Sequence, residues 1–345
     1  MRSVYSILIL AAIALIGTQA CQKTKNTNNT GVLSDASSSM PASAPPSYGG
    51  NGSGLNKLFR ELRYRPETKC ITAGKLQTIT FGKGTRLTFY PNSFKDGAGR
   101  TITSGTVCLE VIEMPKPGDM IANRATTISA GNTILTSGGQ VHIKATKGGE
   151  TVYARKYGIA FKQAASSMQP MALYYGNTNN TDSLVIWGGS SSVTGAFEPG
   201  TTDTLPPPPG DTTGGYGLGF WYQFDSCTDF NWINCDYFYA TTAAKTQVKV
   251  IVADTGANGS NTQVFMAIPA INAALPLYYQ SGAPLTYKTA DIPEGLTASV
   301  VVIMKKNMQY YYSETLAFLI TTQFNIVAYP MPQTIGYIQG RLAAL

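Results

Sequence analysis

The sequence is poor in the residue types on which most enzymes and metal sites depend. It contains one histidine, His142, and five cysteines among 345 residues. Zinc sites draw on several Cys or His ligands, and no two of these cysteines have CxxC spacing, so transition-metal chemistry is not expected. Lys and Arg number 26 against 19 Asp and Glu, but they are scattered rather than clustered as nucleic-acid binding requires. We therefore expect no cofactor, no metal and no nucleic-acid partner.

Long apolar runs are also rare, and the clearest one lies at the N-terminus. Arg2 precedes VYSILILAAIALI at 4–16, which falls short of the ~20 residues that span a bilayer. This pattern predicts a secretory signal peptide over residues 1–20. Thr18-Gln19-Ala20-Cys21 resembles a bacterial lipobox, which implies cleavage before Cys21 and a lipid anchor on that residue. An ordinary signal peptide with an incidental cysteine is the alternative. The lipobox implies an outer-membrane lipoprotein, and basic Gln22-Lys-Thr-Lys25 favours the periplasmic leaflet over the cell surface.

The four other cysteines are Cys70, Cys108, Cys227 and Cys235. An even number of cysteines in an exported chain favours disulfides. Three pairings are possible, and positions along the chain favour Cys70–Cys108 and Cys227–Cys235.

Composition divides the rest of the chain into four parts. Residues 21–55 are rich in Asn, Ser, Thr, Gly and Pro, which predicts a disordered tether. A first domain is expected over 56–188, a Pro/Gly/Thr linker over 189–215 and a second domain over 216–345. Leu55 to Tyr64 has helical spacing of apolar residues and ends before Pro66.

Beyond Pro66 the pattern is that of strands, with no helix of usual length. Apolar and polar residues alternate, and glycines mark the turns. The clearest strands are expected at 77–81, 85–89, 107–111, 152–161, 172–175, 185–187, 247–252, 262–268, 299–304, 316–321 and 325–329. Val300-Val-Val-Ile-Met304 is apolar on both faces, which is typical of a central strand. Short strands with frequent turns predict an all-β protein of two β-sandwiches, the second Ig-like.

Few residues offer catalytic chemistry. His142 lies in a strand-like context without a nucleophile motif, which favours a structural role. Paired carboxylates are the remaining route to a hydrolase, but Glu110 and Glu113 point to opposite faces of one strand. Asp225, Asp229 and Asp236 cluster near the second cysteine pair and could hold calcium, although turn formation also explains them.

Aromatic residues give the remaining signal. Trp221, Trp232 and Tyr310, Tyr311 and Tyr312 lie in aromatic-rich stretches. An exposed set of this kind could bind a glycan by stacking, whereas core packing is the alternative.

Three segments between 84 and 143 resemble a ZU-type β-sandwich domain: Gly84-Thr-Arg-Leu-Thr-Phe-Tyr-Pro-Asn-Ser-Phe94, Gly105-Thr-Val-Cys-Leu-Glu-Val111 and Leu135-Thr-Ser-Gly-Gly-Gln-Val-His-Ile143. The resemblance covers about residues 70–165 and implies a scaffolding or interaction module. Some relatives cleave themselves at His-Phe-Ser, but His142 precedes Ile143 and Lys144, so that activity does not carry over. The second domain is similar to the C-terminal part of Bacteroidota envelope lipoproteins. Such bacteria O-glycosylate short Asp-Ser/Thr motifs, which points to Ser183, Thr204 and Thr212.

These observations lead to one functional hypothesis and two alternatives. The leading hypothesis is a non-enzymatic, membrane-anchored lipoprotein that binds another envelope protein through sheet edges and its aromatic-rich second domain. The alternatives are a glycan-binding module that uses Trp221, Trp232 and Tyr310–Tyr312, and a carboxylate-based hydrolase.

Overall fold

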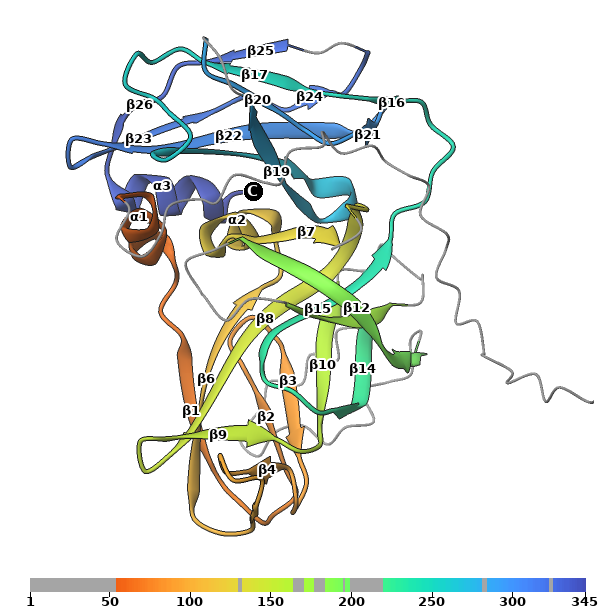
Figure 1. Cartoon of the computed structure of the whole chain (residues 1–345). Helices are drawn as coiled ribbons and strands as arrows, with labels where there is room; N and C mark the ends of the chain where they lie inside the picture. Colours follow the sequence, from red (N-terminus) through yellow and green to blue (C-terminus); the bar gives the residue numbers. More distant parts are fainter. Residues whose placement is uncertain are drawn as a thin grey trace, which may run out of the picture. The chain divides into compact units, whose positions relative to one another are not determined.

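A computed structural model describes residues 54–129, 132–163, 171–176, 184–194, 196–198, 220–280, 284–322 and 325–345. Strands hold about 55% of the structure and helices about 12%, which confirms the all-β prediction with two sandwiches (Figure 1). In these residues no helix is both long enough and apolar enough to cross a membrane. The predicted signal peptide, Cys21, the tether up to residue 53 and the three predicted glycosylation sites lie outside them.

The first sandwich packs a ten-stranded sheet against a five-stranded one. The larger sheet holds β1 (Glu67–Thr72), β4 (Phe94–Lys95), β5 (Thr101–Ile102), β6 (Thr106–Met114), β7 (Ala125–Ser129), β8 (Leu135–Lys147), β9 (Glu150–Ala154), β11 (Ala172–Gly176), β12 (Val185–Thr194) and β15 (Asn231–Phe238). The smaller sheet holds β2 (Gln77–Thr80), β3 (Arg86–Phe89), β10 (Tyr157–Gln163), β13 (Ala196–Glu198) and β14 (Phe220–Cys227). Alternate residues such as Leu87, Leu109 and Phe224 point inward and form one apolar core.

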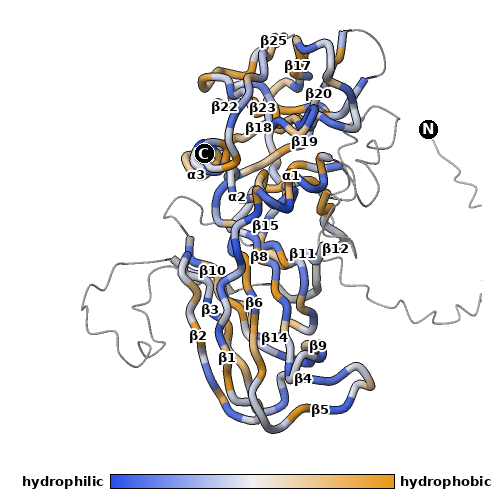
Figure 2. Tube along the Cα trace, turned by 90° about the vertical axis from the view of Figure 1, so that its left-hand side faces the viewer, coloured by the Kyte–Doolittle hydropathy of each residue, from blue (hydrophilic) through white to orange (hydrophobic). Residues whose placement is uncertain are grey.

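The same alternation is visible along β8, where hydrophobic and hydrophilic residues follow one another from Gln140 to Lys147 (Figure 2). Side chains on a strand point to opposite faces in turn, so one face of this half of β8 lines the core. Val141, Ile143 and Ala145 belong to that core.

The second sandwich consists of a nine-stranded sheet that folds over its own core. Its strands are β17 (Lys249–Val252), β18 (Thr262–Ile268), β19 (Ala273–Gln280), β20 (Thr286–Lys288), β22 (Thr297–Lys306), β23 (Gln309–Glu314), β24 (Phe318–Leu319), β25 (Asn325–Ala328) and β26 (Met331–Gln333), with a separate pair β16 (Lys245–Thr246) and β21 (Ile292–Pro293) and a 3-10 turn η1 (Pro269–Ile271). As predicted, β22 is buried on both faces. Val300 and Val302 enter the sandwich core, whereas Val301 and Ile303 pack against the helices.

Three short helices lie where the sandwiches meet (Figure 1): α1 (Gly54–Leu62), α2 (Pro117–Asn123) and α3 (Ile335–Ala343). Helix α2 contacts α1, α3, β7, β18 and β19. Together these elements enclose a separate apolar cluster, which we call the junction. Gly118 lets α2 approach α3 closely, because a Cβ at this position would lie 1.7 Å from the carbonyl oxygen of Leu342. Any larger residue there would push the two helices apart.

The predicted domain boundary at residue 216 does not match the strand pairing. β14 pairs with β10, and β15 lies between β8 and β11, so residues 220–238 belong to the first sandwich. Residues 189–194, expected as linker, continue β12, and residues 196–198 form β13. The pattern of a strand shows which of its faces is apolar but not which sheet it joins, because any core accepts the same alternation.

The two cysteine predictions have different outcomes. Cys70 and Cys108 form a disulfide between directly opposite residues of β1 and β6, as predicted. The predicted Cys227–Cys235 bond is wrong, since both residues are free, buried thiols. Cys227 ends β14 in the five-stranded sheet, and Cys235 lies in β15 of the opposite sheet. The two residues therefore do not share a ladder, although their short separation suggested a hairpin.

Candidate binding surface

The predicted aromatic residues do not form one exposed platform. Trp232 is buried at the junction, with its ring centroid 4.6 Å from that of His142. The Tyr310 hydroxyl donates to Glu61, and the Tyr312 hydroxyl donates to Glu314 at 2.9 Å. Trp221 lies in β14, in the five-stranded sheet of the first sandwich, away from the three tyrosines of β23. Most of these rings are therefore engaged within the protein, as the core-packing alternative anticipated.

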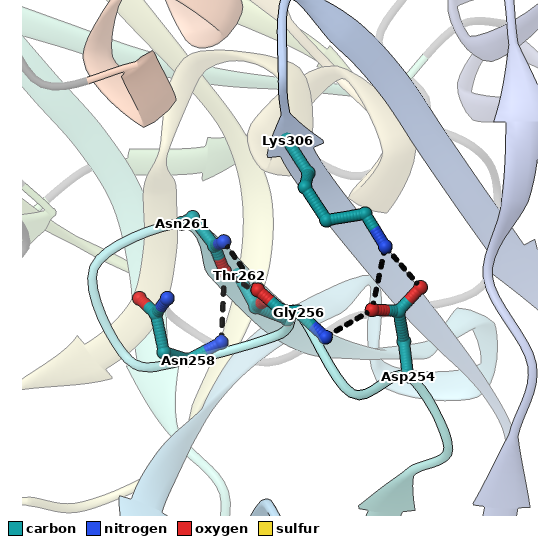
Figure 3. Close-up of polar contacts among 6 residues, drawn as sticks. All are labelled: Asp254, Gly256, Asn258, Asn261, Thr262 and Lys306. Atoms are coloured by element: carbon teal, nitrogen blue, oxygen red, sulfur yellow. Dashed lines mark hydrogen bonds and ion pairs between the residues drawn. The ribbon is translucent and has the colours of Figure 1, made fainter.

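Tyr311 lies beside Lys306 of β22, and Figure 3 shows the loop of the second sandwich with which this lysine pairs. The Lys306 ammonium lies 4.9 Å from the Tyr311 ring and forms an ion pair with Asp254 at 2.7 Å. Asp254 also accepts the backbone N–H of Gly256, and Asn261 accepts the N–H of Asn258. Hydrogen bonds to Lys306 lower the pKa of Asp254. This carboxylate therefore stabilises its own loop.

The candidate carboxylates are also kept apart. Both oxygens of buried Glu113 accept backbone N–H groups, from Lys83 at 2.6 Å and Thr85 at 2.7 Å. Glu110, three residues earlier in β6, lies on the opposite face, 3.8 Å from the Lys144 ammonium. The structure thus does not bring Glu110 and Glu113 together, as alternation predicts.

The aspartates near the free cysteines do not form a site either. Asp225 and Asp229 are exposed and accept hydrogen bonds from their neighbours Gln223 and Thr228. Asp236 is fully buried, and burial raises its pKa well above the usual range. No group of three Asp, Glu, His or Cys side chains suited to a metal occurs in the part of the chain that the structure describes.

His142 is similarly shielded. Burial lowers its pKa to about 4, with a further contribution from the charges of Arg63 and Lys144, so the ring is neutral at neutral pH. A histidine in this state beside Trp232 is a packed side chain of the sheet, as its strand context predicted.

Five of the nine large apolar side chains that are exposed in the described residues lie instead where the second sandwich closes. Residues 325–333 run from β25 to β26, and we call this stretch the closing segment. Its first half pairs with β17 and its second half with β23, strands near opposite ends of the sheet order. Ile326, Ala328 and Pro330 are buried, whereas Val327, Tyr329 and Met331 are 50%, 65% and 60% exposed. The segment therefore seals the core with one face and presents three apolar side chains with the other.

Two further apolar side chains flank the closing segment. Tyr337 of α3 is 48% exposed, and its ring packs edge-on against Tyr312, the partner of Met331 across β23 and β26. Met308 is 78% exposed and lies in the turn between β22 and β23. The side-chain amide of the next residue, Gln309, donates to the carbonyl oxygen of Gln333 at the end of the closing segment. We group Met308, Val327, Tyr329, Met331 and Tyr337 as the closing-segment patch, because all five are exposed and lie on this segment or beside one of its neighbours. Sequence analysis missed it, although the alternation from Asn325 to Met331 was its signal.

Whole-sequence comparison adds no relative to this geometry. No protein-family model matches the chain, and no curated protein matches it.

Proposed function

We propose that this chain is a membrane-tethered, non-enzymatic binding module of the cell envelope and that the closing-segment patch is its contact surface for another protein. The observation that carries the proposal is the outward face of the closing segment, where three successive positions are apolar and at least half exposed. Folded proteins rarely leave contiguous large apolar side chains in water unless a partner covers them. Tyr and Met are also enriched in protein interfaces.

The patch favours docking through side chains rather than strand addition. β26 is the last strand of its sheet, which makes it an edge. Its central residue is Pro332, which has no N–H to offer an incoming strand. A partner would therefore bury Tyr329 and Met331 in a complementary hollow of its own surface. This refines the expectation that a sheet edge itself binds the partner.

The rest of the proposal depends on the sequence. A signal peptide, a lipid on Cys21 and a tether over 21–55 would hold the folded part at the periplasmic face of the outer membrane. A coil of this length has a typical end-to-end distance of ~30–35 Å, enough for the patch to reach a neighbouring protein. The ZU-type resemblance, which implies an interaction module, stays a prediction.

Recovery of partners from the native envelope tests the contact surface. Wild-type protein should capture a discrete protein, and the double variant Tyr329→Ser with Met331→Ser should lose at least nine-tenths of it. Leu76→Ser is the matched control, because Leu76 is 66% exposed but lies in the first sandwich. Capture that survives the double variant, or no protein partner for the wild type, would reject the proposal.

Fractionation tests the anchor separately. Cys21→Ser protein should lose its lipid and leave the membrane fraction, without any change in the folded part. If the variant still fractionates with the outer membrane, a lipid on Cys21 is not what attaches the protein.

A further inference from the structure

Strand β1 forms an edge of the first sandwich. It pairs with β6 along one side, and no described strand pairs with it along the other, which we call the open edge (Figure 1). An edge strand presents unpaired N–H and C=O groups that can pair with another polypeptide. β1 has no proline from Glu67 to Thr72, whereas the edge strand β26 has Pro332 at its centre. The backbone of β1 is therefore able to accept a further strand.

The ladder with β6 shows which groups of β1 face the open edge. Ala73 directly follows β1 and donates its N–H to the carbonyl oxygen of Gly105 at 2.9 Å. In an antiparallel ladder, residues bonded in this way alternate with residues whose N–H and C=O groups point away from the partner strand. Thr68, Cys70 and Thr72 are of the second kind. The 4.0 Å between the Cα atoms of the disulfide partners agrees with this phase, because facing residues approach most closely at non-bonded positions.

Most of these outward groups are unused. The carbonyl oxygen of Thr72 accepts a hydrogen bond from the side-chain amide of Gln77 at 2.9 Å. No other hydrogen bond among the described residues engages the outward backbone groups of Thr68 and Cys70, and both residues are exposed. The centre of the open edge thus offers two N–H donors and two carbonyl acceptors.

The neighbouring edge strand, β2, is protected by β1 itself. β2 ends the five-stranded sheet. The Lys69 ammonium donates to the carbonyl oxygen of Thr80, and a carboxylate oxygen of Glu67 accepts the N–H of Gly82 at 2.7 Å. The two charged side chains of β1 therefore cover the end of β2 rather than their own edge. The fold closes one edge here and leaves the adjacent one open.

Positive charge flanks the open edge at both ends. Arg65 precedes β1 and Lys75 follows it, and both side chains are exposed. Neither forms an ion pair within the described residues. The charge of Lys69 between them is balanced by Glu67, whose carboxylate lies 3.0 Å from its ammonium. An acidic partner would therefore find one free cation at each end of the strand.

We propose that β1 accepts an extended peptide segment of another protein as an additional strand, and that acidic residues at the two ends of this segment face Arg65 and Lys75. Backbone hydrogen bonds with Thr68 and Cys70 supply the affinity, and the flanking charges supply selectivity. The disulfide holds β1 on β6, so the edge is extended before the partner arrives and little ordering cost remains. The proposal does not depend on the closing-segment patch.

The charges of β1 disfavour a second copy of the chain as the occupant. Antiparallel pairing of two copies centred on Cys70 gives the longest overlap, but it brings Lys75 of each copy towards Arg65 of the other. A centre on Lys69 places two lysines opposite each other, and like charges in this position are destabilising. A further shift places Pro66 opposite Cys70, where proline has no N–H to donate. A separate segment with acidic ends meets none of these obstacles.

Amide hydrogen exchange resolved to single residues tests the open edge directly. In the protein alone, the amides of Lys69 and Ile71 donate to β6 and should exchange at least tenfold more slowly than those of Thr68 and Cys70. The probes are three synthetic peptides that share a five-residue core of alternating threonine and valine and carry two aspartates, two lysines or two serines at each end. The aspartate-flanked peptide should slow exchange at Thr68 and Cys70 at least tenfold. The lysine-flanked peptide should bind at least tenfold more weakly.

Variants at the edge separate backbone pairing from side-chain contacts. Thr68→Pro removes an N–H that points to the open edge and leaves the ladder with β6 intact, so it should weaken binding of the aspartate-flanked peptide at least tenfold. Thr68→Ala is the matched control, because it keeps the N–H and should bind like the wild type. Tyr329→Ser should also bind like the wild type, which distinguishes this site from the closing-segment patch.

A charge reversal keeps the test independent of any folding defect in Thr68→Pro. Arg65→Glu combined with Lys75→Glu changes two exposed side chains and should reverse the preference, so that the lysine-flanked peptide binds better. No binding of the aspartate-flanked peptide, or binding that leaves exchange at Thr68 and Cys70 unchanged, would overturn the proposal. Slow exchange of both amides in the concentrated protein alone would overturn it in favour of a second copy.

Discussion

The two sandwich cores and the junction between them are built by different means. The first sandwich buries Glu113, which accepts the N–H groups of a single turn, whereas the junction buries a charged residue that connects separate elements. Arg124 is fully buried and donates to the side-chain oxygens of Gln263 at 2.9 Å and Asn56 at 2.8 Å, and its guanidinium lies 4.3 Å from the Phe59 ring. One side chain thus connects α1, the end of α2 and β18.

The difference affects how uniquely each region fixes the arrangement of its own elements. Apolar cores tolerate repacking when their volume is kept, because dispersion contacts have little directionality. Hydrogen bonds to a buried guanidinium are directional and costly to break, so they hold neighbouring elements in one arrangement. The sandwiches therefore supply most of the apolar burial, whereas Arg124 fixes how the helices meet β18.

Removal of Arg124 should have the largest effect on this arrangement. Arg124→Ala leaves the oxygens of Asn56 and Gln263 without their donor and opens a void beside Phe59. We expect a loss of about 3–5 kcal/mol in unfolding free energy, measured by denaturant titration. The transition should also split in two as the sandwiches uncouple. Arg100→Ala, at an exposed ion pair, is the control and should not change the curve. A single unchanged transition for Arg124→Ala would mean that apolar packing alone fixes the junction.

Reduction of Cys70–Cys108 should act on the first sandwich alone. The bond closes a loop with a sequence separation of 38, and the chain-entropy model gives a stabilisation of ~2–4 kcal/mol. Thermal melts with and without reductant should show the first sandwich destabilised by this amount and the second unchanged.

Thiol labelling provides the matching check on the cysteines. Unreduced protein without Cys21 should react at Cys227 and Cys235 when unfolded and at neither when folded, because burial raises the pKa of the Cys227 thiol to about 12. An unfolded sample with no reactive thiol would contradict the free cysteines of the structure.

Acidification should lower the unfolding free energy through His142, which packs against the junction residue Trp232. The pKa of His142 is about 4 in the folded state and 6.5 in an unfolded chain. Below pH 6.5 the unfolded chain gains a proton that the folded protein does not, so stability falls between pH 6.5 and 4. We expect a loss on the order of 2 kcal/mol across this window. His142→Gln should abolish that slope, and an identical pH profile for the variant would show that other groups cause it.

Asp236→Asn should have a smaller effect on stability, and the effect should have the opposite dependence on pH. Burial raises the pKa of Asp236, so the folded protein holds this proton to a higher pH than the unfolded chain, which ionises the carboxyl above about pH 4. Native stability is therefore lost as the pH rises from that value. The neutral amide removes this cost, and we expect about 1–2 kcal/mol of added stability at pH 7.5 but none at pH 4. Equal stability of the two proteins at both pH values would place an ionised Asp236 in the folded state.

The sequence predicted most local structure because local patterns carry it. Alternation placed β2, β3, β6, β18 and β22 within a few residues, and helical spacing found α1. It missed α2 and α3. α2 has only seven residues, too few for a helical period to stand out. In α3 the buried residues Ile338 and Leu342 have helical spacing, but Gly336 and Gly340 hide the pattern because glycine is uncommon inside helices.

The sequence could not assign strands to sheets or locate the candidate surfaces. β14 and β15 have the same alternation as the strands of the second sandwich, so their return to the first was not visible. The closing-segment patch depends on which apolar residues the fold leaves exposed. These are relations between distant residues, which periodicity along one chain does not contain.

The late entry of β15 into the first sandwich has a consequence for the order of folding. This strand lies between β8 and β11, yet it ends only at residue 238. A chain that emerges from its N-terminus therefore cannot complete the first sandwich until almost 240 residues are available, and much of the sequence of the second sandwich follows soon after. A fragment cut at residue 188 would leave β8, β10 and β11 each without one of its neighbouring strands, β15 for β8 and β11 and β14 for β10. The two sandwiches should thus mature almost together rather than one after the other.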